Sequence, residues 1–440
     1  MLLKPLTWLL VLLAPGWAAV AQPSYKFDFG PGQAAPGYQP VQPTDVYSSA
    51  KGYGFDFNTA PTGVDWGGRD PLTSDFVTSR QPFYFSVAVP EGNYNVTVTL
   101  GDLKDNSENF LKAESRRLLL ATTATKPGQL YTQTWTVNVK SRRINDSLQV
   151  ALKPRELHKL DWDDRLTLEF DGAPSALVAL EITPAPTATT IFLAGNSTVV
   201  NQDDEPWAAW GQMLPSFFQP GVAVANHAES GLSLASFLGS HRLAKVLRVM
   251  KPGDYLFIEF GHNDQKEHGP HDGPFLAYTE RLKLFISETR QRGGIPVLLT
   301  STSRRSFGAS SKIENSLGDF PAAVRQVAQQ ENVLLIDLNA MTTKLYEAIG
   351  PEESKKAFVH YPANSYPSQP EPLADNTHFN PYGAYEVARC VVAGLQQCIP
   401  QLARHLRPGL PPFDPAHPDA LAAWRWPESP RSAVTKPDGN

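Results

Sequence analysis

Cysteine and methionine are scarce in this chain, which has two cysteines and four methionines among its 440 residues. Two cysteines are too few for a disulfide scaffold or for a zinc site built from several cysteines. If one unbroken helix holds Cys390 and Cys398, it separates them by about 12 Å, which is beyond bridging distance. A disulfide between them therefore requires the helix to end before Cys398; otherwise both are free thiols.

Charge is also limited. Charged residues make up 19% of the chain, the formal net charge is -5, and no basic run is long enough to indicate a nucleic-acid partner. Hydrophobic residues make up 41%, an ordinary value for a globular protein with a buried core. At roughly 100–200 residues per domain, the chain has room for two domains.

Long hydrophobic runs are missing too. Residues 8–14 are apolar but fall short of the about 20 residues that cross a bilayer. Lys4 precedes this run and the small residues Ala19-Val20-Ala21 follow it, a pattern typical of a signal peptide. We therefore predict a signal peptide at residues 1–21 and export to the periplasm or the extracellular space, the alternatives being an uncleaved anchor or a buried helix. No later segment has the pattern of a membrane span.

Residues 22–183 have the pattern of β structure. Residues 83–89 and 94–100 flank the turn cluster Pro90-Glu91-Gly92-Asn93, which predicts a hairpin. Further strands are predicted at residues 117–122, 131–139, 147–152, 166–170 and 176–182. Short strands at this density, with no helical pattern between them, predict an antiparallel β-sandwich.

The pattern changes after a short stretch rich in proline, alanine and threonine, which predicts a hinge at residues 184–189. Beyond it, apolar runs alternate with amphipathic stretches, which predicts a parallel sheet covered by helices on both faces over residues 190–405. The predicted strands are residues 190–194, 222–225, 255–260, 296–300 and 333–338, and the predicted helices are residues 232–250, 275–292, 320–330 and 383–395. Residues 406–440 are rich in proline and form either a strap over the surface or a disordered tail.

Polar residues follow the first three of these strands and precede the last helix, in four blocks at residues 195–198, 226–231, 261–264 and 375–378. In a parallel α/β sheet, ligands bind outside the carboxyl ends of the strands. We therefore expect the four blocks to converge on one site.

The residue types in these blocks suit acyl transfer. A serine nucleophile needs a base, and the base needs a third group to orient it, roles that fit Ser197, His378 and Asp375. The backbone N–H groups of Ser197 and Gly231 and the side-chain amide of Asn263 would supply donors for the oxyanion. Taken singly, Ser197 is more often a helix cap and His378 a surface or packing residue, while Asp375, Gly231 and Asn263 are compatible with ordinary turns. Their combination favours a serine esterase.

Two further features have alternative interpretations. Arg304-Arg305 follow the fourth predicted strand and either lie solvated on the surface or recognise uronate carboxylates. Trp207 and Trp210 either pack in the core or offer Trp210 as a stacking surface for sugar. We predict no metal and no cofactor, because the spacing of His262, His268 and His271 fits no standard zinc motif.

The four blocks, in this order, resemble the SGNH/GDSL hydrolase family. Within it the chain looks most like rhamnogalacturonan acetylesterases, in residues 194–199, 210–213 and 259–264, while residues 27–32 with 53–56 resemble a galactose-binding-like sandwich. The resemblance implies a flavodoxin-like three-layer fold and deacetylation of a plant cell-wall polysaccharide, rhamnogalacturonan in particular. An esterase for acetylated xylan or another acyl ester, and a carbohydrate-binding protein with a weak or inactive hydrolase domain, stay open as alternatives.

The chain departs from the family pattern at Asn196, where the family has an aspartate before the nucleophile. An amide keeps the ability to form hydrogen bonds but loses the negative charge. The departure puts normal turnover in doubt, although nucleophile, base and oxyanion donors are all present.

Overall fold

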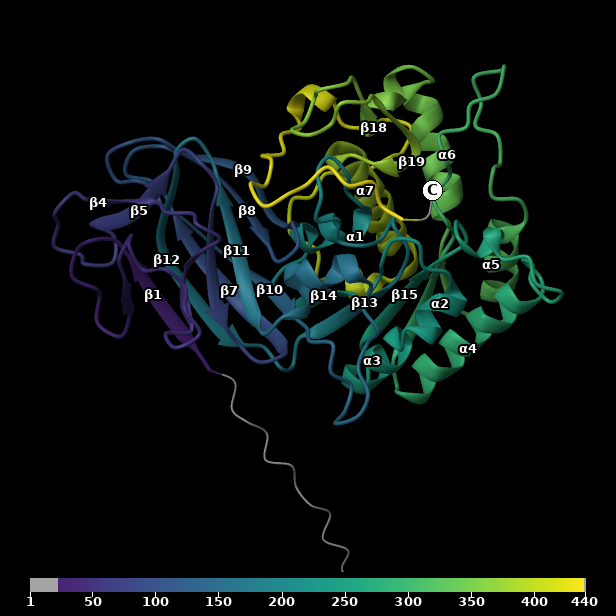
Figure 1. Cartoon of the computed structure of the whole chain (residues 1–440), viewed down its shortest axis with the longest axis horizontal. Coiled ribbons are helices and arrows are strands. Elements are labelled where there is room, and N and C mark those ends of the chain that lie inside the picture. Colours follow the sequence, from purple (N-terminus) through teal and green to yellow (C-terminus); the bar gives the residue numbers. More distant parts are fainter. Residues whose placement is uncertain (1–22, 439–440) are drawn as a thin grey trace, which may run out of the picture.

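The computed structural model describes residues 23–438, so the predicted signal peptide at residues 1–21 lies outside the described part. Two domains lie side by side, a β domain built from the first part of the chain and an α/β domain built from the rest (Figure 1). Among the helices of residues 23–438, none has the length and apolar character that crossing a membrane requires.

The first domain is the predicted sandwich of two sheets. The seven-stranded sheet contains β1 (Tyr25–Phe29), β2 (Gln39–Val41), β4 (Thr62–Asp65), β5 (Asp75–Ser79), β7 (Gly92–Leu100), β10 (Tyr131–Val139) and β12 (Ser175–Pro184). The five-stranded sheet contains β3 (Tyr53–Asp56), β6 (Phe83–Ala88), β8 (Ser107–Ala113), β9 (Arg117–Thr125) and β11 (Arg165–Asp171). Pairing is antiparallel throughout except between β1 and β2, which are parallel. Apolar side chains from both sheets fill the space between them, as where the Phe27 and Phe85 rings meet at 5.3 Å.

Two local predictions for this domain were wrong. The expected hairpin does not form, because β6 pairs with β3 and β11 in one sheet while β7 pairs with β10 and β12 in the other. Turn residues mark a reversal of the chain, but tertiary packing decides whether the strands pair or cross between sheets. Residues 147–152 form no strand either. The Asn145 side chain accepts the backbone N–H groups of Ser147 and Leu148, which folds this segment into a turn with an isolated Arg143–Gln149 bridge.

The second domain is built on a fully parallel sheet in the order β14-β13-β15-β16-β17. Its strands are β13 (Thr189–Gly195), β14 (Val222–Asn226), β15 (Tyr255–Glu259), β16 (Ile295–Leu299) and β17 (Leu334–Ile336). The second strand in the chain lies outside the first, as in flavodoxin-like sheets, so the chain reverses direction across the sheet next to β13. This confirms the predicted fold class.

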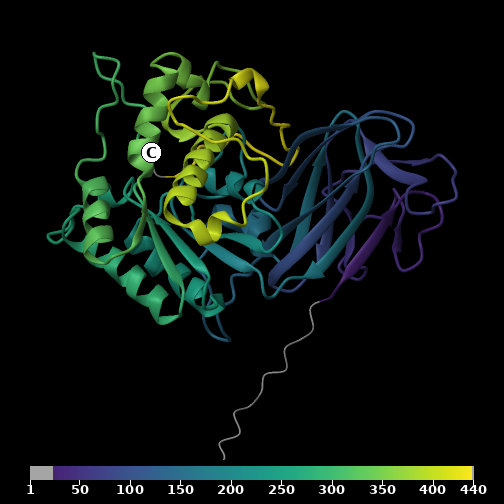
Figure 2. The same cartoon turned by 180° about the vertical axis from the view of Figure 1, so that it is seen from behind.

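Helices cover both faces of this sheet (Figures 1 and 2). One face packs against α1 (Trp210–Met213), α6 (Leu338–Ile349) and α7 (Pro381–Cys398), and the other against α2 (Leu234–Gly239), α3 (Arg242–Val249), α4 (Ala277–Gln291) and α5 (Phe320–Gln330). A two-stranded sheet of β18 (Phe358–Tyr361) and β19 (Leu373–Phe379) precedes α7, and the short α8 (Pro400–Ala403) follows it. Six 3-10 helices complete the described elements: η1 (Pro154–His158), η2 (Leu160–Trp162), η3 (Leu214–Phe217), η4 (Asp264–Lys266), η5 (Glu353–Ala357) and η6 (Leu421–Ala423).

Two helix predictions need correction. Residues 232–250 form two helices instead of one, because His241 has a left-handed φ of 62° and starts α3 in a new direction. Helix α7 continues unbroken through both Cys390 and Cys398, and both are free thiols. The Cys398 thiol donates to the Gly394 carbonyl, so the helical geometry excludes the disulfide that the sequence left open.

The stretch predicted as a hinge is a packed turn between β12 and β13. Ala185 and Ala188 are buried, Ala185 N donates to Asn93 O, and Lys251 Nζ donates to Ala188 O. The two domains are therefore fixed to each other at the point where the chain passes between them.

The proline-rich C-terminal segment is a strap and not a disordered tail up to residue 438. It crosses the boundary between the two domains (Figures 1 and 2). Lys112 of the sandwich donates to Pro427 O at 2.7 Å, Ser429 Oγ donates to Glu169 at 2.9 Å, and Arg431 donates to His158 O at 2.7 Å.

A buried ion pair joins the sandwich to the α/β domain. Glu156 of η1 and Arg242 of α3 are both fully buried, and their closest atoms lie 2.6 Å apart. Arg242 also donates to His227 O, directly after β14. Phe110 and Leu118 of the sandwich belong to the same apolar cluster as β13 and α7, so the two domains share one core.

Because removal of one member of a buried pair leaves an uncompensated charge, Glu156→Ala should lower the free energy of unfolding by about 3–5 kcal/mol. Urea denaturation measures this loss. Glu353→Ala, which removes an exposed ion pair with Lys356, serves as control and should leave the free energy nearly unchanged. Equal effects of the two substitutions would contradict the account of the interface.

Candidate active site

Three side chains from two distant parts of the chain form a continuous hydrogen-bonded line. His378 Nε2 lies 2.7 Å from Ser197 Oγ, and His378 Nδ1 lies 2.7 Å from Asp375 Oδ2. Ser197 follows β13, whereas His378 and Asp375 lie on β19, the strand before α7. The structure thus brings together the serine, base and acid that the sequence proposed, in the geometry that activates a hydroxyl.

Asp375 stays ionised in this arrangement. Burial alone would raise its pKa, but the hydrogen bond and charge of His378 lower it, helped by the backbone N–H groups of His378 and Thr377. Together they hold the pKa of Asp375 well below its usual value. A permanently charged acid fixes the imidazole so that Nε2 faces the serine and stabilises the imidazolium that forms.

The expected oxyanion donors lie on adjoining loops. Glu229 N donates to Gly195 O, which ties the loop after β14 to the loop of the nucleophile. Gly231 has a φ of +78°, a left-handed conformation that favours glycine. A side chain at this position would disfavour the turn and so change the orientation of its backbone N–H. Asn263 Nδ2 donates to Leu232 O at 3.1 Å, and since an amide nitrogen carries two donors, one N–H remains for a ligand.

The sandwich domain holds the loop that carries Gly231. Lys159, nearly fully buried, donates to Glu229 Oε2 at 2.8 Å and to Asn201 O at 3.2 Å. Lys153 Nζ donates to Ser230 O at 2.6 Å. Burial alone would lower the pKa of Lys159, but the charges of Glu229 and Asp203 outweigh it and raise the pKa, so the ammonium stays charged. No sequence pattern pointed to these lysines, because only the fold brings residues 153–159 to this loop.

Glu259, at the end of β15, is hydrogen-bonded to the loop that carries the nucleophile. Thr198 Oγ1 lies 3.1 Å from Glu259 Oε1 and 2.9 Å from Asn196 Oδ1, and Trp210 Nε1 donates to Glu259 Oε2. The Thr198 hydroxyl has one proton, which it can donate to Asn196 Oδ1 or to Glu259 but not to both. If Glu259 is protonated, it donates to Thr198 Oγ1 while Thr198 donates to Asn196, and all three side chains have a hydrogen bond. Burial raises the Glu259 pKa to about 7, which favours that protonated form. In the sequence, Glu259 is recognisable as the one charged residue at the end of the otherwise uncharged strand β15.

Asn196 keeps the hydrogen bonds that a family aspartate would accept at this position. Its Oδ1 accepts from both the backbone N–H and the hydroxyl of Thr198, which closes the turn that presents Ser197. Its Nδ2 has no hydrogen-bond partner among the described residues. The neutral amide avoids a second acid beside the buried Glu259, so the substitution is compatible with the observed triad geometry.

The residues proposed to contact substrate, Trp210, Arg304 and Arg305, are mostly occupied by contacts within the protein. Trp210 is fully buried and donates to Glu259, so of the two interpretations offered by the sequence the structure supports core packing and not a sugar-stacking surface. Trp207 is also buried, with its Nε1 3.4 Å from Asp375 Oδ2. Arg305 donates to Pro351 O, Ser354 Oγ and Asn376 Oδ1, which commits its guanidinium to holding the loop before His378. Arg304 is partly exposed and donates to Ser316.

The three histidines do not converge. His262 is buried after β15, whereas His271 pairs with Glu280 at the start of α4. Within residues 23–438, no group of three or more histidine, cysteine or acidic side chains is placed to bind a metal.

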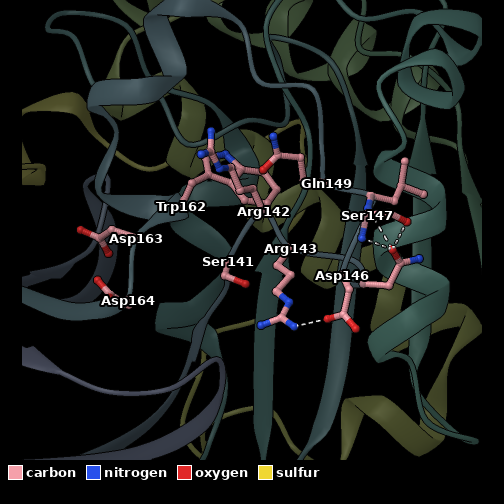
Figure 3. A pocket seen from close by; sticks show the side chains of 11 residues that line it. Ser141, Arg142, Arg143, Asp146, Ser147, Gln149, Trp162, Asp163 and Asp164 are labelled. Atoms are coloured by element: carbon pink, nitrogen blue, oxygen red, sulfur yellow. Dashed lines mark hydrogen bonds and ion pairs between the residues drawn. The ribbon is translucent and has the colours of Figure 1, made fainter.

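Residues of the sandwich segment line a cavity of about 600 Å³ (Figure 3). Residues 141–143, 145–149 and 162–164 line it, and none of the triad residues does. An ion pair joins Arg143 and Asp146 at its wall, and the Trp162 ring already has the cations of Lys140 and Arg242 against it. We assign this cavity no part in the reaction.

Two family models match this chain. The GDSL-like lipase/acylhydrolase family matches residues 193–385, which contain all the triad residues. The beta-agarase/YXIM esterase-like, galactose-binding domain-like family matches residues 25–145 of the sandwich.

Three curated relatives, all from Bacillus subtilis, match at length. Rhamnogalacturonan acetylesterase RhgT is 43% identical over 218 residues, covering 49% of this chain and 93% of the relative. The probable rhamnogalacturonan acetylesterase YesY is 33% identical over 213 residues, covering 48% of this chain and 94% of the relative. The uncharacterized esterase YxiM is 27% identical over 382 residues, covering 85% of this chain and 91% of the relative, which extends the similarity to both domains.

The raised pKa of Glu259 predicts a pH-dependent effect of Glu259→Gln. With a pKa of about 7 against an ordinary 4.5, the folded protein keeps a proton that the unfolded chain releases. The stability from this group is therefore fully present below pH 4.5 and lost as pH rises to about 7. Gln does not ionise, so the free energy of unfolding of the variant relative to wild type should rise by on the order of 3 kcal/mol between pH 4.5 and pH 8. Urea denaturation across this range, with Glu353→Gln as control, measures it; a pH-independent difference would contradict the assignment.

Lys159→Met should displace the loop of Gly231 and lower kcat at least roughly tenfold, since small misplacements of catalytic groups are costly. Lys140→Met is the matched control, because Lys140 forms a similarly buried pair with Asp161 but does not bond to residues 227–231. Ester hydrolysis and thermal unfolding, measured on both variants, separate the two roles. Comparable kcat losses in both would show that Lys159 acts through stability alone.

Proposed function

The chain belongs to the GDSL-like lipase/acylhydrolase family and is an esterase, and we propose that it removes acetyl groups from an acetylated polysaccharide, rhamnogalacturonan foremost. The observation that carries the proposal is the Ser197–His378–Asp375 line, with both hydrogen bonds at 2.7 Å. RhgT, which is 43% identical to this chain over 218 residues, supports an acetylesterase activity.

In the proposed reaction, Ser197 Oγ attacks the acetyl carbonyl while His378 Nε2 takes its proton. The carbonyl oxygen becomes an oxyanion, and the backbone N–H groups of Ser197 and Gly231 and the Asn263 amide donate to it. The tetrahedral intermediate collapses as His378 returns the proton to the sugar oxygen, which leaves an acetyl group on Ser197. Water activated by His378 then releases acetate and restores the serine.

Support for an acetylated polysaccharide comes from the relatives. RhgT is named a rhamnogalacturonan acetylesterase and YesY a probable one. The bonding distances of the triad and the retained acceptor at Asn196 argue against an inactive hydrolase domain. Esters of acetylated xylan or other acyl groups are the alternative substrates.

The sandwich serves, in our proposal, as a structural partner of the catalytic domain. It shares an apolar core with that domain, and its lysines bond to the loop before Gly231. We also propose that the protein is exported, on the strength of the signal-peptide pattern at residues 1–21.

Ser197→Ala should reduce acetate release from acetylated rhamnogalacturonan by at least about 10³-fold, because the nucleophile is lost while the fold is retained. An enzymatic acetate assay measures the loss, and Ser216→Ala, which alters a serine in η3, is the matched control. Near-wild-type release by Ser197→Ala would overturn the mechanism. Faster release from acetylated xylan than from acetylated rhamnogalacturonan would overturn the proposed substrate and leave the mechanism standing.

A further inference from the structure

A carboxylate lies in a basic site next to Gly231. The Asp438 carboxylate is 2.9 Å from Lys153 Nζ and 3.9 Å from Arg155 Nη1. A Cβ added to Gly231 would lie 2.9 Å from Asp438 Cβ and 3.0 Å from Lys153 Nζ. An acidic side chain of the C-terminal strap therefore sits in contact distance of the turn proposed to hold the oxyanion.

The ammonium in this site is held in place before any ligand arrives. The backbone N–H of Lys153 donates to Glu156 Oε2 at 2.9 Å, and Glu156 is fixed by its buried pair with Arg242. Lys153 Nζ donates to Ser230 O as well as to Asp438 Oδ2. A lysine ammonium has three donors, so one fixed bond to Ser230 leaves capacity for a carboxylate.

Among the described residues, Asp438 is the one carboxylate within ion-pair distance of Lys153. Glu229 pairs with two neighbouring cations, lying 2.8 Å from Lys159 Nζ and 3.7 Å from Arg155 Nε. Removal of the Asp438 carboxylate would therefore leave the Lys153 ammonium without an ion-pair partner and open to another anion.

The site adjoins a cavity of about 640 Å³, a volume within the usual range for small-ligand pockets. Arg155, His158, Lys159, Asp203 and Asp204 line it together with residues of the strap, among them Arg431, Lys436 and Asp438. Arg155 and Asp438 both line this cavity, so a carboxylated sugar in it could place its acid group where the Asp438 carboxylate lies, beside Arg155 and within reach of Lys153.

We propose that Lys153 and Arg155 form a subsite for the carboxylate of a uronate residue in the substrate, and that Asp438 occupies it as an internal competitor. The inference rests on the proposed function, since it supplies the acid recognition that a uronate-containing polysaccharide requires. It also replaces Arg305, whose guanidinium is committed to Pro351, Ser354 and Asn376.

Competition against a neutral ester tests the subsite. The assay follows 4-nitrophenyl acetate hydrolysis by the full chain and measures Ki for an unacetylated oligogalacturonide and for its methyl-esterified form. In wild type the charged inhibitor should bind more tightly than the methyl ester. Lys153→Met should raise the Ki of the charged inhibitor about tenfold, and Asp438→Asn should lower it roughly threefold because the competing carboxylate is gone.

A second lysine–aspartate pair provides the matched control. Lys344 on α6 lies 2.6 Å from Asp414 and ties the same C-terminal segment to the domain, outside the residues that line the cavity. Lys344→Met and Asp414→Asn should leave both Ki values unchanged if the effects at Lys153 and Asp438 are local.

The subsite is wrong if wild type binds the two inhibitors equally, or if Lys153→Met raises both Ki values by the same factor. The second result would show that Lys153 acts only by holding Ser230. Failure of the proposed function is distinguishable, because it appears as absent acetate release from acetylated rhamnogalacturonan while 4-nitrophenyl acetate hydrolysis and the competition persist.

Discussion

The hydrogen bond between Ser197 and His378 joins residues 181 positions apart in the chain, and the rest of the α/β domain positions its two ends. The parallel sheet places Ser197 at the carboxyl end of β13. Ala208 N donates to Phe379 O, which holds β19 against the segment after the nucleophile. The Asn380 side chain then accepts Gly383 N and starts α7 directly behind the histidine. These contacts of the chain itself hold the two distant residues at hydrogen-bonding distance.

The second requirement of the site, a fixed loop at Gly231, depends on charges that the sandwich contributes. Burying Lys159, Glu229, Glu156 and Arg242 is costly unless each charge is paired, and each of them is. The pairs give the interface a specific geometry that apolar packing alone would not impose. The β domain therefore holds a loop of the active site in place although it contributes no triad residue. The packed turn between the domains keeps them in the same fixed arrangement.

Much of this architecture follows from the sequence. The alternation of apolar runs and amphipathic stretches predicted the α/β/α domain, and polar blocks after successive strands predicted which residues meet. The failures have physical causes. The turn at Pro90–Gly92 reverses the chain but does not determine whether β6 and β7 pair. Residue spacing does not encode contacts between distant segments. Such contacts bury Trp210, occupy the Arg305 guanidinium and bring Lys153 and Lys159 to the loop of Gly231.

The central claim is that Ser197 becomes acetylated during turnover. Rapid acid quenching of the protein during hydrolysis of an acetyl ester, followed by peptide mass spectrometry, measures this directly. The account predicts that the peptide containing Ser197 gains the mass of one acetyl group and that the modified residue is the serine. Acetyl transfer to another residue, or none under conditions where deacylation limits the rate, would contradict it.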